Sequence, residues 1–212
     1  MKRTIKFLVL FITFTIVQVG CSGKSEEQLV KESYENYKAA LLNDKGDEAI
    51  KYVDSNTIKY YTDILNFTKK LDSTNIEILS IFDKVMILTI RQTISKEDIL
   101  KFDGKSLLVY GIKSGMVEKN SFVNNSIGEV IIEDGVAKGQ LISNGKKTSI
   151  FLHFSKEAGT WKVDLTSLFS MFENALKKSA KESGQEENKF IFSLFEMAYG
   201  KKPDSSIWKP IK

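Results

Sequence analysis

The sequence has few of the residues that build enzyme active sites and metal centres. Among its 212 residues it contains one cysteine, Cys21, and one histidine, His153. A lone cysteine excludes a disulfide within one chain, and the usual zinc sites need several histidine or cysteine ligands. Only a site built from oxygen ligands stays open, and no glycine-rich phosphate loop or nucleophile motif is present. We therefore predict neither a metal site nor a cofactor.

Arginine is scarce as well. Arg3 and Arg91 are the only arginines among 31 basic residues, so lysine supplies nearly all of the positive charge. Arg91 lies inside the apolar segment 85–94, where its planar guanidinium offers a bidentate fork that lysine lacks. We favour an internal salt bridge to a partly buried carboxylate, with Asp164 or Asp103 as candidates. The alternative is a role for Arg91 in binding an anionic ligand.

Long blocks of like charge are absent too. Three of the 31 basic residues lie within the first six positions, which leaves 28 against 27 acidic residues over the remainder. The lysines of that remainder are interleaved with acidic residues. A nearly neutral chain without a basic patch lacks the positively charged surface that binds the phosphates of nucleic acid. We predict that nucleic acid is not a partner.

The N-terminus carries the most informative motif. Basic residues at positions 2, 3 and 6 precede an apolar run over residues 7–17, and Gly20 and Cys21 follow. An apolar run of this length is too short to span a bilayer, and a small residue before a cysteine marks a cleavage point. The stretch resembles a bacterial lipoprotein signal peptide, with an ordinary secretory signal as the alternative.

The resemblance implies a lipid anchor. Residues 1–20 would be removed, Cys21 would carry acyl chains such as palmitate, and residues 21–28 would form a tether to the domain. The expected location is the cell envelope, as a membrane-anchored lipoprotein, in the outer membrane if the cell is Gram-negative. The membrane would be contacted through the N-terminal lipid.

Apolar spacing predicts helices in the first half of the chain. Val30, Tyr34, Tyr37 and Leu41 recur at helical intervals. Further helices are predicted over residues 55–71, 96–102 and 107–116. Residues 76–94 fit either a helix or a strand, and we favour a helix.

An antiparallel meander is predicted next. Strands over residues 130–132, 136–142, 149–155 and 161–165 are separated by turn residues that include three glycines. Two C-terminal helices follow, the second over residues 186–199. The predicted fold is α+β, with helices on one side of a four-stranded sheet. We assign residues 29–200 to a single domain and residues 201–212 to a tail.

The order of elements from Glu26 to Leu165 resembles the nuclear-transport-factor-2-like (NTF2-like) fold, a cystatin-like cone, of small exported bacterial proteins. The closing strand pair, residues 151–155 and 159–165, carries most of the likeness. The resemblance implies a sheet whose concave face holds a pocket. His153 in such a pocket, with Asp164 on the neighbouring strand, would be an acid/base pair like that of isomerase-like and cyclase-like members. We favour the alternative, a structural histidine.

These observations favour a non-enzymatic binding or interaction module of the cell envelope. Its partner would be an envelope protein or a small apolar ligand, held in a pocket between the sheet and the helices. Two alternatives stay open. One is a small NTF2-like enzyme that uses His153 and Asp164. The other is a structural accessory of envelope assembly that docks through its C-terminal helices.

Overall fold

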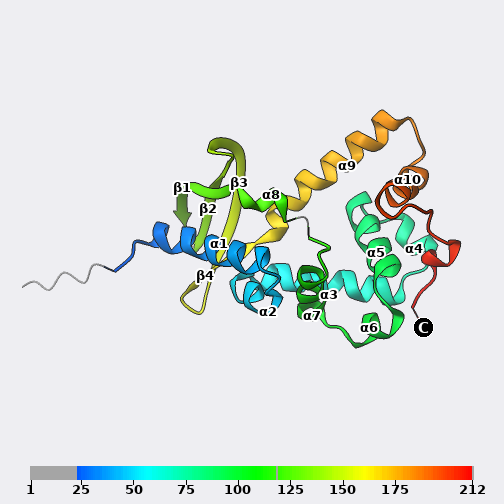
Figure 1. Ribbon diagram of the computed structural model, residues 1–212, viewed down its shortest axis with the longest axis horizontal. Helices are drawn as coiled ribbons and strands as arrows, with labels where there is room; N and C mark the ends of the chain where they lie inside the picture. Colours follow the sequence, from blue (N-terminus) through cyan, green and yellow to red (C-terminus); the bar gives the residue numbers. More distant parts are fainter. Residues whose placement is uncertain (1–22, 118, 212) are drawn as a thin grey trace, which may run out of the picture.

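The computed structural model describes residues 23–117 and 119–211. Helices fill the first half, a sheet follows, and two further helices lead to the C-terminal segment (Figure 1). The elements are α1 (Glu26–Leu42), α2 (Gly46–Ala49), η1 (Ile50–Tyr52), α3 (Ser55–Lys70), α4 (Ser73–Glu77), α5 (Ile81–Thr93), α6 (Lys96–Lys101), α7 (Gly104–Lys113), α8 (Asn120–Val123), β1 (Asn125–Glu133), β2 (Val136–Ser143), β3 (Lys146–Glu157), β4 (Thr160–Asp164), η2 (Leu165–Leu168), α9 (Phe169–Ser183), α10 (Glu187–Tyr199) and η3 (Ser205–Trp208).

The four strands form one antiparallel sheet in the order β1-β2-β3-β4. This confirms the predicted meander. Each hairpin closes through two consecutive residues of positive φ, at Asp134-Gly135, Asn144-Gly145 and Ala158-Gly159. Such tight turns match the right-handed twist of the paired strands. Register shifts at residues 127–130 of β1 and 140–142 of β2 add local bends to the sheet.

Helix α1 covers one face of this sheet. Its predicted apolar stripe is buried, and Tyr34 and Leu41 are almost completely inaccessible to solvent. The stripe packs against the strand residues Leu152, Phe154, Trp161 and Val163. Because side chains alternate along a strand, the neighbouring positions His153 and Asp164 lie on the opposite face, where both are partly exposed.

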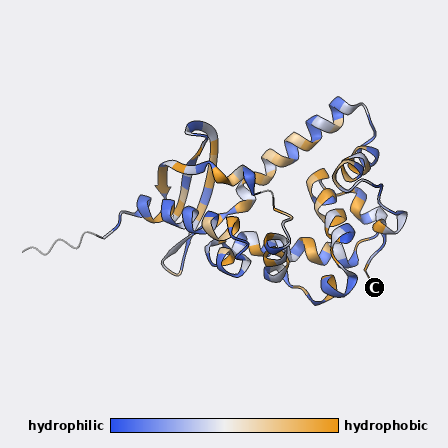
Figure 2. Cartoon of the chain, in the orientation of Figure 1, coloured by the Kyte–Doolittle hydropathy of each residue, from blue (hydrophilic) through white to orange (hydrophobic). Residues whose placement is uncertain are grey.

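The other long helices form a second packed region. Residues of α3, α5 and α7 share one hydrophobic cluster, and α5 and α10 share another with η3. Figure 1 places the sheet and α1 at one end of the molecule and this helical region at the other, with α9 running from the sheet toward α10. In Figure 2, hydrophobic and hydrophilic residues are interleaved along these helices, as expected when each buries one side.

The fold is therefore α+β with a four-stranded antiparallel sheet, as predicted, but the packing of the helices differs from the prediction. Only part of the helical content lies on the sheet, because the buried apolar residues of α3 and α5 pack in the helical clusters. Helix α7 contributes to both regions, with Leu107 in a helical cluster and Leu108 and Ile112 in the core at the sheet.

The ambiguous segment 76–94 is helical over most of its length, as the end of α4 and the whole of α5, which confirms the favoured interpretation. Ser80 starts α5 by accepting a hydrogen bond from the Asp83 N–H at 3.1 Å.

Both ends of the described chain are more ordered than predicted. The expected tether reached residue 28, yet α1 begins at Glu26. Ser25 and Gln28 there form a reciprocal capping box. The expected tail, residues 201–212, packs on the helical region over its described part. Ile207 is buried in the cluster of α5 and α10, and the Ile211 N–H donates to the Lys69 carbonyl oxygen at 3.1 Å.

Candidate binding site

The candidate site is a groove between α5 and α7 that extends to the C-terminal end of α10. Asp103 begins α7, where its carboxylate accepts a hydrogen bond from the Ser106 N–H at 2.8 Å. After α7 ends at Lys113, residues 114–117 run along the groove and add Met116 and Val117 to its wall. The two capped helices and this short connection fix the shape of the site.

The inner part of the groove is a small apolar cavity of about 170 Å³. An engineered apolar cavity of about 150 Å³ is large enough to hold benzene, so this one admits a ring or a short alkyl segment. Burial raises the pKa of Tyr61 to about 12, which keeps its phenol neutral near neutral pH. The cavity is lined by Tyr61, Met86, Thr89, Ile90, Leu107, Leu108, Gly111, Met116 and Val117.

A larger hollow of about 640 Å³ adjoins the cavity, and the two share Thr89 and Met116 as lining residues. Hydroxyl groups are frequent in this outer part. The Thr93 hydroxyl donates to the Thr89 carbonyl oxygen at 2.7 Å. The side-chain hydroxyls of Thr89, Tyr110, Ser114 and Tyr199 hydrogen-bond to no other described group. The outer hollow is therefore a neutral, hydroxyl-bearing entrance to an apolar cavity.

Charged side chains are missing from the described lining of both parts of the groove. This is unusual in a sequence in which 27% of the residues are charged. The other hollows described in the structure each include at least one charged residue, such as Glu32, Lys105 or Asp83. The groove differs from them in its chemistry as well as in its shape.

Gly111 is the most informative residue of the groove. It lies within α7, and a Cβ atom added there would meet no atom within 4 Å. Gly104 of the same helix is different, because a Cβ atom there would collide with Ile58 and Thr62. A glycine inside a helix costs about 1 kcal/mol relative to alanine. Close packing explains Gly104, whereas at Gly111 the missing side chain leaves the cavity open.

The strand register places His153 directly opposite Asp164, as the acid/base hypothesis requires. Their side chains nevertheless form no pair. The Asp164 Oδ1 atom accepts hydrogen bonds from the Thr166 N–H at 2.9 Å and the Thr166 hydroxyl at 2.5 Å, which caps η2. No hydrogen bond or ion pair joins the His153 imidazole to any described residue, and neither His153 nor Asp164 lines the groove.

Arg91 has a different partner from the predicted one. Its Nε and Nη2 atoms donate to the Thr68 carbonyl oxygen at 3.0 and 2.7 Å. Nη2 also donates to the Leu71 carbonyl oxygen at 2.6 Å, and Nη1 to that of Ile207 at 2.9 Å. Burial lowers the pKa of Arg91 to about 10, so it stays charged near neutral pH.

The predicted carboxylate partner of Arg91 was therefore wrong. Asp103 caps α7 and Asp164 caps η2, while the guanidinium meets backbone carbonyls where α3 ends. These carbonyls lack partners within the helix and carry the negative end of its dipole, so they attract a cation much as a carboxylate does. The contacts give Arg91 a structural role that links α5, α3 and η3.

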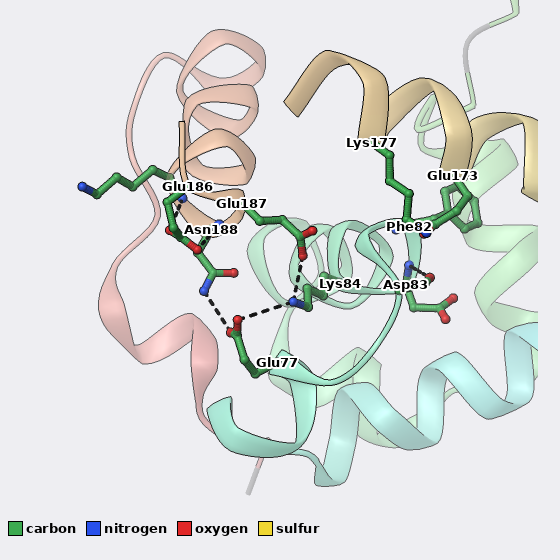
Figure 3. Close-up of polar contacts among 11 residues, drawn as sticks. Glu77, Phe82, Asp83, Lys84, Glu173, Lys177, Glu186, Glu187 and Asn188 are labelled. Carbon is green, nitrogen blue, oxygen red and sulfur yellow. Dashed lines mark hydrogen bonds and ion pairs between the residues drawn. The ribbon is translucent and has the colours of Figure 1, made fainter. Parts of the chain in front are cut away.

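Lys84 is a structural residue that the sequence did not single out. It is only 3% exposed, and its Nζ atom lies 2.8 Å from Glu187 Oε1 and 3.6 Å from Glu77 Oε1. Glu77 also accepts a hydrogen bond from the Asn188 side-chain amide at 2.9 Å. Figure 3 shows these residues meeting between α4, α5 and α10. The helical spacing of Lys84 from buried Ile81 could have indicated its burial.

The groove itself was also missed. We expected a pocket between the sheet and the helices, and hollows do lie there, one between α1 and β4 and one between α3, β3 and β4. The groove is a different site, because no strand residue is among the described residues that line it. One signal was available in the sequence. Gly111 interrupts an apolar run at residues 107–116 that is otherwise typical of a helix, and an isolated glycine inside a helical pattern calls for an explanation.

Cys21, the predicted lipidation site, lies outside the described residues. Within the described part of the chain, no group of three histidine, cysteine, aspartate or glutamate side chains is placed to hold a metal ion. No helix in that part is long and apolar enough to cross a membrane.

No protein-family model matches this sequence, and comparisons with curated proteins and with solved structures found no match. A functional proposal for this chain therefore rests on its own residues, chiefly those of the groove.

Proposed function

We propose that the protein is a lipid-anchored protein of the bacterial cell envelope that acts as a non-enzymatic binding module, with the groove between α5, α7 and α10 as its ligand site. The observation that carries the proposal is Gly111. This glycine leaves a cavity open at a helix position where alanine would fit without a clash. With glycine at this position, α7 is about 1 kcal/mol less stable than it would be with alanine. We interpret this loss of stability as the cost of keeping the cavity open.

The proposed anchor is supported by the N-terminal sequence. Basic residues, a short apolar run and the Gly20-Cys21 junction have the pattern of a lipoprotein signal. Each buried methylene of an acyl chain contributes about 0.8 kcal/mol of membrane affinity, and two or more chains give stable anchoring. The proposed location is the membrane of the cell envelope, which is the outer membrane if the cell is Gram-negative.

The finer fold assignment, an NTF2-like cone, belongs to the same proposal. Its support is the order of elements, with helices before a bent four-stranded meander and the 17-residue α1 across one face of that sheet. The helices from α4 to α7 and after β4 are additions to such a core. They form the groove, so the proposed ligand site lies in the additions rather than on the sheet.

The anchor predicts the behaviour of a single variant. Cys21→Ser should prevent acylation, because serine lacks the thiol that accepts the lipid. Its precursor should stay unprocessed by the lipoprotein pathway, whereas wild-type protein should fractionate with membranes and carry acyl chains detectable by mass spectrometry. Wild-type protein that is found free of membrane with an unmodified cysteine would contradict the anchor.

The groove predicts binding of an uncharged fluorescent probe, N-phenyl-1-naphthylamine, whose emission rises in apolar surroundings. Wild-type protein lacking residues 1–21 should bind it, and Gly111→Leu should weaken binding at least about tenfold, because the new side chain occupies the cavity. The measurement is a fluorescence titration, with thermal unfolding as a check of folding.

Two variants serve as matched controls for that titration. Gly111→Ala should stabilise the protein by about 1 kcal/mol and reduce probe binding far less than leucine does, since alanine adds only one carbon. His153→Gln, which lies outside the groove, should leave binding unchanged. Equal probe binding by wild type and a folded Gly111→Leu variant would refute the groove as the ligand site.

A further inference from the structure

We infer that the ligand of the groove is an uncharged amphiphile, with its apolar end in the inner cavity and a neutral polar group among the outer hydroxyls. The inference rests on the proposed function, in which the groove is a ligand site. It goes further by assigning the ligand's chemical class from the lining of the groove.

The absence of charge in the groove is the first step. None of its described lining residues is an aspartate, glutamate, lysine, arginine or histidine, and burial raises the pKa of both Tyr61 and Tyr199. A charged ligand group seated here would lose water without gaining a counter-charge, which is unfavourable. The groove therefore disfavours both carboxylates and ammonium groups relative to neutral ones.

The polarity of the groove changes along its length, which sets the orientation of the ligand. The inner end is walled mainly by aliphatic and thioether side chains, among them Met86, Ile90 and Leu107. The outer part presents the side-chain hydroxyls of Tyr110 and Ser114, which bond no other described group. Hydroxyl groups both donate and accept, so they suit an alcohol, ester or amide group of a ligand.

The size of the groove supports a small molecule. The inner cavity of about 170 Å³ takes one ring or the end of an alkyl chain, and the outer hollow of about 640 Å³ gives room for the remainder. The methionines Met86 and Met116 have flexible side chains that adapt to different apolar shapes. The combination fits a neutral compound with one alkyl chain.

Three compounds with the same ten-carbon chain test the assignment near neutral pH. They are 1-decanol, which is neutral, decanoate, which is anionic, and decylammonium, which is cationic. Each competes with N-phenyl-1-naphthylamine for wild-type protein in a fluorescence displacement titration. We expect 1-decanol to displace the probe at a concentration at least about tenfold lower than either charged compound, which corresponds to about 1.4 kcal/mol.

A variant that adds charge makes the test reciprocal. Ser114→Lys places an ammonium group at the outer hollow. Decanoate should then displace the probe at a concentration at least about threefold lower than with wild-type protein. The concentration of decylammonium that is needed should not fall. Ser114→Gln adds bulk without charge, and decanoate should gain no such improvement from it.

The outcomes separate the two levels of the proposal. In one outcome, Gly111→Leu abolishes probe binding, but all three compounds displace the probe equally from wild-type protein. This outcome would overturn the assignment of an uncharged ligand and leave the groove as the ligand site. Tighter binding of decanoate or decylammonium than of 1-decanol would overturn it as well. Failure of wild-type protein to bind the probe would instead overturn the proposed function.

Discussion

Replacing Arg91 with lysine is expected to lower the free energy of unfolding by about 2 kcal/mol, although the charge is conserved. The guanidinium donates four hydrogen bonds to the carbonyl oxygens of Thr68, Leu71 and Ile207. A single ammonium group cannot reach all three acceptors in this planar arrangement. At least one partly buried carbonyl would lose its partner, and each such loss costs about 1 to 3 kcal/mol.

Chemical denaturation monitored by circular dichroism measures this effect. The matched control is Lys178→Arg, because the Lys178 side chain is 76% exposed and a change of cation there should have almost no effect. A second signature is local, since loss of the bond to Ile207 should increase amide hydrogen exchange in η3. An Arg91→Lys variant as stable as wild type would show that the guanidinium geometry is unimportant.

The ion pair between Lys84 and Glu187 is expected to respond unequally to the loss of one member or the other. Glu187→Gln should destabilise the fold by about 2 kcal/mol, because it leaves a buried charge without its nearest partner. Lys84 is 3% exposed, and only Glu77, at 3.6 Å, would remain to compensate its charge. Lys84→Met should cost less than about 1 kcal/mol. Methionine fills a similar volume, and Glu187 and Glu77 are exposed enough to be solvated by water.

Equilibrium unfolding of both single variants and of the double variant tests this asymmetry. Once Lys84 is methionine, the further change Glu187→Gln should have little effect, so the two losses should be far from additive. The surface pair Lys101 and Glu97 is the control, because both of its side chains are largely exposed and either loss should change stability by less than about 0.5 kcal/mol. A larger loss for Lys84→Met than for Glu187→Gln would contradict the account.

Local signals allowed much of the fold to be predicted. Asp134-Gly135 and Asn144-Gly145 are strong hairpin signals because both residues of such a turn need positive φ, and the structure has these values. The stripe of Val30, Tyr34 and Leu41 predicted a helix that is buried on one side, and α1 has that side against the sheet. In each case residues close in sequence determine the local conformation.

Contacts between distant parts of the chain could not be predicted in the same way. The acceptor of Arg91 Nη1 lies 116 residues later, in a segment expected to be a tail. A backbone carbonyl leaves no signature in the sequence, so a carboxylate was the natural guess for the partner. The groove has the same difficulty, because it needs the end of α10 beside α5 and α7. Gly111 was the one local sign of it.

Methionine methyl NMR tests the central claim, that the groove between α5 and α7 is a ligand site, most directly. Met86 and Met116 line the groove, whereas Met171 lies on α9 outside it. With carbon-13 in the methionine methyl groups, addition of N-phenyl-1-naphthylamine should shift the Met86 and Met116 signals and leave that of Met171 in place. Unchanged Met86 and Met116 signals at probe concentrations that saturate fluorescence would contradict the account, because the probe would then bind elsewhere.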